Sequence, residues 1–102
     1  MSDGFLINQR IFDAILMRHR LQFRIGHIIY VVEPHAYGIT HDRRQVLWAW
    51  QTAGDDANVQ AEWVLYQTDE MRDVQRLAET FEGPRPGYRR DNEFMREIHD
   101  QL

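Results

Sequence analysis

Two apolar runs separated by a short polar turn constrain the fold of this chain more than any other feature. The first runs from Val31 through a Glu33-Pro34 corner to Ile39, and the second spans 45–51. β-Branched and aromatic residues dominate both runs, which is typical of strands. Because proline donates no ladder hydrogen bond and favours an extended residue before it, the first strand should bend or break at Pro34. A bent antiparallel hairpin is predicted.

Shorter elements flank this hairpin. Asn8 is a typical N-cap, and apolar residues at helical spacing predict a helix over 8–18. Alternating or dense apolar patterns predict further strands over 20–25, 27–32, 62–67 and 71–77. The last of these is ambiguous, because Val74 and Leu77 also fit a helix, but a strand is favoured by its position among short β elements. The small and acidic residues at 54–58 predict a loop.

The C-terminal part of the chain has a different pattern. Gly83–Tyr88 contains two prolines and predicts a stiff, extended connector over 82–90. Asp91 or Asn92 could cap a final helix over 91–102. Its apolar stripe consists of Phe94, Ile98 and Leu102, with Met95 beside them. The residues therefore predict one mainly β domain over 1–102, a strongly curved sheet or small barrel with a helix at each end.

Charge and composition limit the classes of function. The formal net charge of −4 argues against general attraction to nucleic acid or anionic membranes, so such binding needs a local basic patch. All 12 basic residues are arginine, which suits bidentate anion recognition but also reflects codon usage in a GC-rich genome. The absence of cysteine excludes disulfides and predicts a cytoplasmic setting. The residues from Met1 to Gly4 do not resemble a signal peptide, and no apolar run approaches the ~20 residues of a membrane span.

An ordered series of motifs resembles the WYL domain family of bacterial regulators. The series consists of Phe23, Gly26, Val31–Gly38, Leu47–Gln51 and Trp63–Met71. Phe81–Tyr88 is similar to the segment that closes short, stand-alone members of the family. The resemblance implies an Sm-like or SH3-like β-barrel of about five strands over 20–81. It also implies a ligand-sensing or regulatory role, which in several families responds to nucleic acid or nucleotide-type ligands.

The chain departs from the family pattern at several positions. Of the three residues that name the family, only the leucine is shared, since the aligned positions are Gln45, Val46 and Leu47. Basic residues are common before the Glu-Pro corner and after the aromatic residue of the fourth strand, where this chain has Tyr30 and Gln67. Both departures weaken phosphate binding, because cationic side chains dominate nucleic-acid affinity.

Candidate ligand-binding residues cluster around the corner. Glu33, His35 and Tyr37 share one face if the bend at Pro34 is mild, and they could bind a polar ligand. The alternative is that Glu33 and His35 hydrogen-bond to backbone at the corner while Tyr37 packs at a barrel end. Trp50 and Trp48 share a face and could stack on bases, whereas Trp63 is favoured as core. The candidate set is His35, Tyr37, Arg24, Trp50, Glu33, Tyr66, Arg43 and Arg44, of which the three arginines form the best local basic patch.

Catalytic and metal-binding signatures are weak. The five histidines lack metal-type spacing, the single serine is Ser2, and His41-Asp42 is a dyad by adjacency alone. We therefore expect a non-enzymatic module without a cofactor that binds a small ligand or nucleic acid. The alternative is an interaction module that forms a homodimer, or docks on a partner protein, through a barrel face or the C-terminal stripe.

Overall fold

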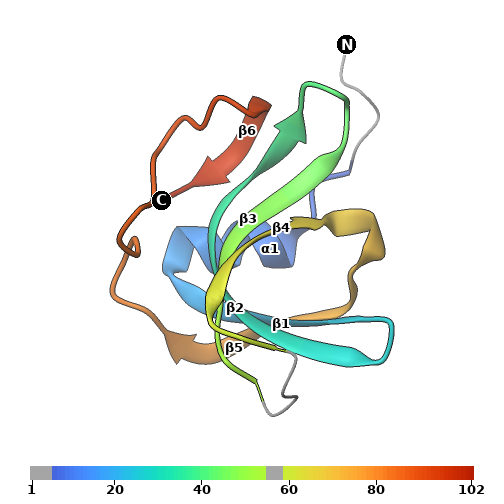
Figure 1. The fold of residues 1–102 in the computed structure, drawn as a ribbon, viewed down its shortest axis with the longest axis vertical. Helices are drawn as coiled ribbons and strands as arrows, with labels where there is room; N and C mark the ends of the chain where they lie inside the picture. The colour runs from blue at the N-terminus through green and yellow to red at the C-terminus, as the bar shows by residue number, and fades with distance from the viewer. Residues whose placement is uncertain (1–5, 55–58) are drawn as a thin grey trace.

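The computed structural model describes residues 6–54 and 59–102 (Figure 1). A helix, α1 (Gln9–Met17), precedes an antiparallel sheet of six strands. The strands are β1 (His19–Ile25), β2 (Ile28–Thr40), β3 (Gln45–Gln51), β4 (Glu62–Gln67), β5 (Arg72–Thr80) and β6 (Met95–Gln101), and a 3-10 turn, η1 (Thr68–Glu70), joins β4 to β5. The prediction of a mainly β chain with an N-terminal helix is confirmed. Most of the loop predicted at 54–58 lies outside the described residues, as does the stretch from Met1 to Gly4.

Helix α1 begins where its sequence predicts. The Asn8 side-chain oxygen accepts hydrogen bonds from the backbone N–H groups of Arg10 and Ile11 at 3.0 and 3.4 Å. The helix ends at Arg18, whose φ of 57° is left-handed. Ile11 and Ile15 face the sheet and are buried. Within the described part of the chain, no helix is long and apolar enough to cross a membrane.

The sheet is organised around the 13-residue strand β2. On one edge β2 pairs with β3, and on the other edge its first half pairs with β1 and its second half with β6 (Figure 1). The expected irregularity at Pro34 is present as a register shift between Pro34 and Ala36, and the strand continues through it. Strand β5 forms from the segment that was ambiguous between strand and helix.

The predicted closed barrel is not formed. The strand order is β4-β3-β2-β1-β5, so β4 and β5 lie at the two ends of the path. Closure requires a ladder between the terminal strands, yet the ladders found for β4 and β5 join them to β3 and β1, respectively. Six strands in an open sheet therefore replace the barrel of about five strands over 20–81.

The predicted C-terminal helix over 91–102 is also wrong, because this segment contains β6. Residues four apart lie on one face of a strand as well as of a helix, so the stripe pattern fits both. Strand β6 pairs with the half of β2 that β1 leaves free, from Ala36 to Thr40. At Gly38 a Cβ atom would overlap the carbonyl oxygen of Glu97, so glycine permits the close approach of the two strands.

Apolar side chains form two clusters. The larger one lies between α1 and the sheet and contains Ile11, Ala14, Ile15, Leu21, Phe23, Val32, Tyr37, Leu47, Ala49, Tyr66 and Met71. The smaller one contains Ala36, Val46 and Met95, with Trp48, Tyr88, Phe94 and Ile98 packed against it. No helix or strand is formed from Phe81 to Phe94, a segment that includes the predicted connector over 82–90. Tyr88 of this connector, Phe94, Ile98 of β6 and Trp48 of β3 cover the smaller cluster.

Candidate functional site

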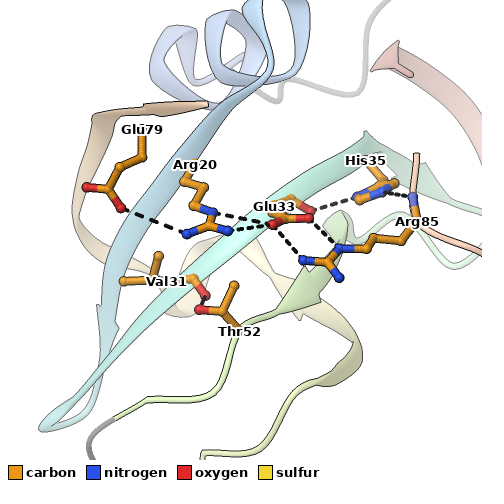
Figure 2. Close-up of polar contacts among 7 residues, drawn as sticks. All are labelled: Arg20, Val31, Glu33, His35, Thr52, Glu79 and Arg85. Atoms are coloured by element: carbon orange, nitrogen blue, oxygen red, sulfur yellow. Dashed lines mark hydrogen bonds and ion pairs between the residues drawn. The ribbon is translucent and has the colours of Figure 1, made fainter. Parts of the chain in front are cut away.

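Glu33 lies at the centre of an ion-pair cluster in which its carboxylate is buried and the two arginines are partly exposed (Figure 2). It is 1% exposed and accepts hydrogen bonds from Arg85 Nε at 2.7 Å and Arg85 Nη2 at 2.9 Å. Arg20 donates to the same carboxylate from Nε at 3.3 Å and Nη2 at 3.1 Å. Burial by itself would raise the pKa of Glu33, but the hydrogen bonds and charges of Arg85 and Arg20 outweigh it and lower the pKa. Glu33 is therefore an ionised anchor for two arginines.

His35 joins the same cluster in a single tautomer. Its Nε2 accepts the backbone N–H of Arg85 at 3.0 Å, so Nδ1 carries the proton and donates to the Glu33 carbonyl at 2.7 Å. The ring lies among Trp63, Phe81 and Tyr88, with centroids 4.8 to 5.8 Å away. The pKa of His35 is lowered, mainly because burial disfavours the charged form of the ring. Glu33 and His35 thus bind the Phe81–Tyr88 segment. His35 bonds to backbone, as in the alternative above, whereas the Glu33 carboxylate bonds to arginine side chains.

The two candidate tyrosines are also committed to internal contacts. Tyr37 lies in the larger core cluster, where its hydroxyl donates to Gln45 Oε1 at 3.0 Å and accepts the Asn8 N–H at 2.8 Å. The Tyr66 hydroxyl donates to Gln51 Oε1 at 2.6 Å, and burial raises the pKa of both tyrosines. His35 instead contacts the aromatic residues outside this cluster. The register shift between Pro34 and Ala36 therefore separates His35 from Tyr37, although the sequence suggested a shared face.

Trp50 belongs to an aromatic group beside the Glu33 cluster. Its ring meets Trp63 edge-on at 5.5 Å, and Trp63 stacks on Trp48 at 5.1 Å with an interplanar angle of 8°. The Arg85 guanidinium carbon lies 5.3 Å from the Trp50 ring centroid, within cation–π range. All three tryptophans are half-buried. The Arg85 guanidinium thus contacts the Trp50 ring and the Glu33 carboxylate at the same time.

Arg43 and Arg44 lie in the turn between β2 and β3. Arg44 donates from Nε to Asp42 at 3.2 Å and from Nη1 to Gln67 at 2.8 Å. The hollow beside this turn has a volume of about 530 Å³ and contains two aspartates, Asp42 and Asp69, as well as the two arginines. The formal charges of the two aspartates and the two arginines therefore cancel in this hollow.

Arg24 lies at a more strongly basic location. A hollow of about 640 Å³ is lined by Asn8, Arg10, Gln22, Phe23, Arg24, Ile29, Met71, Arg72, Asp73, Val74 and Gln75, and is called the basic hollow below. Arg24 donates to Asp73 at 3.1 Å, and Arg72 donates from Nη1 to the backbone carbonyls of Asp69 and Met71. Within the described ranges, no salt bridge within 4 Å is found for Arg10 or Arg72. Three arginines against one aspartate give this hollow a formal charge of +2.

Arg24 and Arg72 are direct partners in the β1–β5 ladder. Like charges in this position destabilise a sheet, and the single Asp73 carboxylate offsets only part of the repulsion. Arg24 was predicted from the sequence to bind a ligand, whereas Arg10 and Arg72 were not. The predicted helix over 8–18 and the predicted strand over 71–77 contain these two residues. The ladder that brings Arg72 to Arg24, and the packing of α1 against β1 and β5, join distant parts of the chain.

The remaining candidates show no catalytic arrangement in the described parts. His41 Nε2 lies 2.8 Å from the Glu93 carbonyl oxygen, while the Asp42 carboxylate contacts Thr40 and Arg44. Within residues 6–54 and 59–102, no group of three or more His, Asp or Glu side chains is placed to hold a metal ion. In comparisons with known proteins, no protein-family model, curated protein or solved structure matches the chain.

Proposed function

We propose that this chain is a non-enzymatic regulatory module of WYL type that binds a phosphate-bearing, nucleotide-type ligand in the basic hollow. The ligand is either a free nucleotide or part of a single-stranded nucleic acid. The observation that carries the proposal is the direct pairing of Arg24 with Arg72 across two strands. An anion between these guanidinium groups would relieve their repulsion and accept hydrogen bonds from both.

The charge distribution supports this location. The chain as a whole carries −4, whereas the basic hollow carries +2. An anionic ligand is therefore attracted to one part of the surface and repelled by most of the rest. The hollow also lies at the start of α1, where the helix dipole favours negative charge.

The lining of the hollow suits a nucleotide better than an inorganic ion. Ile29 is 56% exposed at the side of the hollow and Val74 is half-buried, whereas Phe23 and Met71 are buried beneath it. Gln22 and Gln75 add amide donors and acceptors. A base could pack on the apolar atoms while the arginines contact phosphate oxygens, as in other mixed apolar and cationic sites.

The fold is compatible with the proposal in its general form. A short helix followed by a bent antiparallel sheet supports a relationship to Sm-like or SH3-like barrels, of which this sheet would be an open version. The residues first selected at the corner then have a supporting role, since Glu33, His35 and Tyr37 hold the sheet and the connector together. Arg24 is the selected residue that contacts the ligand.

Binding of a fluorescent nucleotide and a short single-stranded oligonucleotide, measured by anisotropy over 50–300 mM salt, tests the proposal. The double variant Arg24→Gln/Arg72→Gln should lose at least tenfold in affinity, and each lost phosphate contact should reduce the single-strand salt slope by about 0.7. The matched control is Arg89→Gln/Arg90→Gln, which removes the same charge from exposed connector residues. An equal loss in both variants, or no binding by the wild type at 50 mM salt, would refute the proposal.

A further inference from the structure

Among the described residues, strands β4, β5 and β6 each pair with a single neighbour, and their outer edges differ in how well they are protected. The β5 edge carries Arg72, Asp73, Arg76 and Glu79, and Asp73 interrupts it with a left-handed φ of 54°. Charges and local distortions of this kind prevent edge strands from pairing with other chains. The β4 edge carries one charge, Glu62 at its first position, and contains neither proline nor glycine. The third edge strand, β6, carries Arg96, Glu97 and Asp100, so β4 is the least protected of the three edges.

The outer edge of β4 has no pairing partner in the described parts of the chain. Its ladder joins it to β3, and β4 ends the strand path. Leu65, near the middle of the strand, is 42% exposed, and the half-buried Trp63 lies two residues away on the same face. An unpaired edge with an exposed leucine is the pattern that strand addition uses.

We infer that β4 pairs with β4 of a second copy of this chain, in an antiparallel ladder across a two-fold axis at Leu65. An axis perpendicular to the sheet keeps each side chain on its own face, so residues opposite each other must both be at odd or both at even positions. Leu65 is then opposite Leu65 of the second copy, Val64 opposite Tyr66, and Trp63 opposite Gln67. This register extends the sheet from one subunit into the other.

The charges on the strand edges favour β4 of a second copy, rather than β5 of a second copy, as the partner of β4. In the Leu65 register Glu62 is opposite Thr68, so no like charges face each other. Pairing of β4 with β5 of a second copy would instead have to accommodate four charged residues and the left-handed Asp73. Two-fold pairing also closes with two subunits, whereas head-to-tail pairing would continue into a filament or ring.

This dimer is independent of the proposed ligand site. The basic hollow lies between α1, β1 and β5, and β4 is at the opposite end of the strand path. The predicted C-terminal stripe is not the interface in this proposal, because Phe94 and Ile98 pack against the smaller cluster. Loss of nucleotide binding and loss of dimerisation should therefore be separable by mutation.

Light scattering coupled to size exclusion tests the dimer. The wild type should elute with about twice the chain mass of 12.3 kDa, and Leu65→Lys should be a monomer. The control Ala78→Lys adds the same charge at an exposed position of the β5 edge and should remain a dimer. A monomeric wild type at 200 μM, or a dimer that persists in Leu65→Lys, would overturn the inference.

A second experiment does not depend on how well Leu65→Lys folds. Because the chain has no cysteine, Leu65→Cys introduces a single thiol at the two-fold axis. Mild oxidation should convert this variant into a covalent dimer, since opposed residues in an antiparallel ladder lie within disulfide reach. Ala78→Cys should remain mostly uncrosslinked. Equal crosslinking of the two variants would exclude the β4 interface.

Discussion

Arg85 and Glu33 are 52 positions apart in the chain and form a two-point ion pair, with Nε–Oε1 at 2.7 Å and Nη2–Oε2 at 2.9 Å. The backbone N–H of Arg85 also bonds to His35. One connector residue thus binds both polar side chains of the Glu-Pro-His corner in β2. The Phe81–Tyr88 segment is therefore held in place by specific hydrogen bonds as well as by its aromatic contacts.

Removal of this pair should destabilise the fold. Arg85→Ala leaves the buried Glu33 carboxylate with Arg20 alone, and we expect the free energy of unfolding to fall by about 2 kcal/mol. Arg89→Ala, at an exposed position of the same connector, should change it by less than about 0.5 kcal/mol. Urea denaturation followed by tryptophan fluorescence measures both values. Equal stability of the two variants would show that the ion pair is not important for the fold.

Stability should decrease as the pH falls below about 6.5, the ordinary pKa of histidine. Burial lowers the pKa of His35 and of His99 in the folded chain, so the unfolded chain binds more protons in this range. The stabilisation is complete above about pH 6.5 and is lost as the pH falls toward the lower folded pKa values. Glu33, whose pKa is also lowered, adds to the loss only below its usual value near 4.5.

Unfolding curves at pH 7.5, 6.5 and 5.5 test this pH dependence. The slope of the unfolding free energy should be smaller in His35→Gln than in the wild type. His27→Gln removes a histidine from an exposed turn and should leave the slope unchanged. If the wild type were equally stable at pH 7.5 and 5.5, the account of His35 as a buried neutral residue would be wrong.

Gly38→Ala should displace β6. The new Cβ would overlap the carbonyl oxygen of Glu97, and overpacking of this kind costs about 1–3 kcal/mol. Hydrogen exchange should show lost protection over 95–101, while β4 keeps its protection. Gly26→Asn is the control, because a Cβ at Gly26 meets no neighbouring atom and asparagine tolerates its φ of 61°. Unchanged exchange in Gly38→Ala would argue against the β2–β6 ladder.

Arg72→Gln should stabilise the free protein while it weakens ligand binding. The substitution removes the repulsion between Arg72 and Arg24, and a gain of about 0.2–1 kcal/mol is expected. Improved stability at the expense of binding is typical of functional sites. Thermal unfolding with and without nucleotide separates the two effects. A variant that is less stable than the wild type without ligand would show that any repulsion between the arginines is smaller than the contribution of the hydrogen bonds from Arg72 to the Asp69 and Met71 carbonyls.

Local patterns predicted the elements whose signals are local. The Asn8 cap predicted the start of α1, and Pro34 predicted the irregularity in β2. The C-terminal strand could not be predicted in this way. Apolar residues at Phe94, Ile98 and Leu102 fit a helix and a strand equally. The choice depends on the half of β2 that β1 leaves free, which the local pattern does not show.

Less of the candidate site than of the fold could be predicted, because its contacts also join distant parts of the chain. Arg24 was selected because it lies on the polar face of a strand, and the ladder then places Arg72 opposite it. Glu33 and His35 were selected for their chemistry, but their partner Arg85 is 50 or more positions away. A sequence pattern cannot show whether a polar residue is already satisfied by a distant part of the chain.

The most direct test of the proposed function is an NMR titration of the ¹⁵N-labelled chain with a nucleoside monophosphate at 50 mM salt. Chemical-shift changes should concentrate on the residues of the basic hollow, namely Asn8, Arg10, Gln22, Arg24, Arg72 and Gln75. They should disappear in Arg24→Gln/Arg72→Gln and persist in Arg89→Gln/Arg90→Gln. Shifts that concentrate instead on the β2–β3 turn, or no shifts at millimolar ligand, would contradict the assignment of the basic hollow as the binding site.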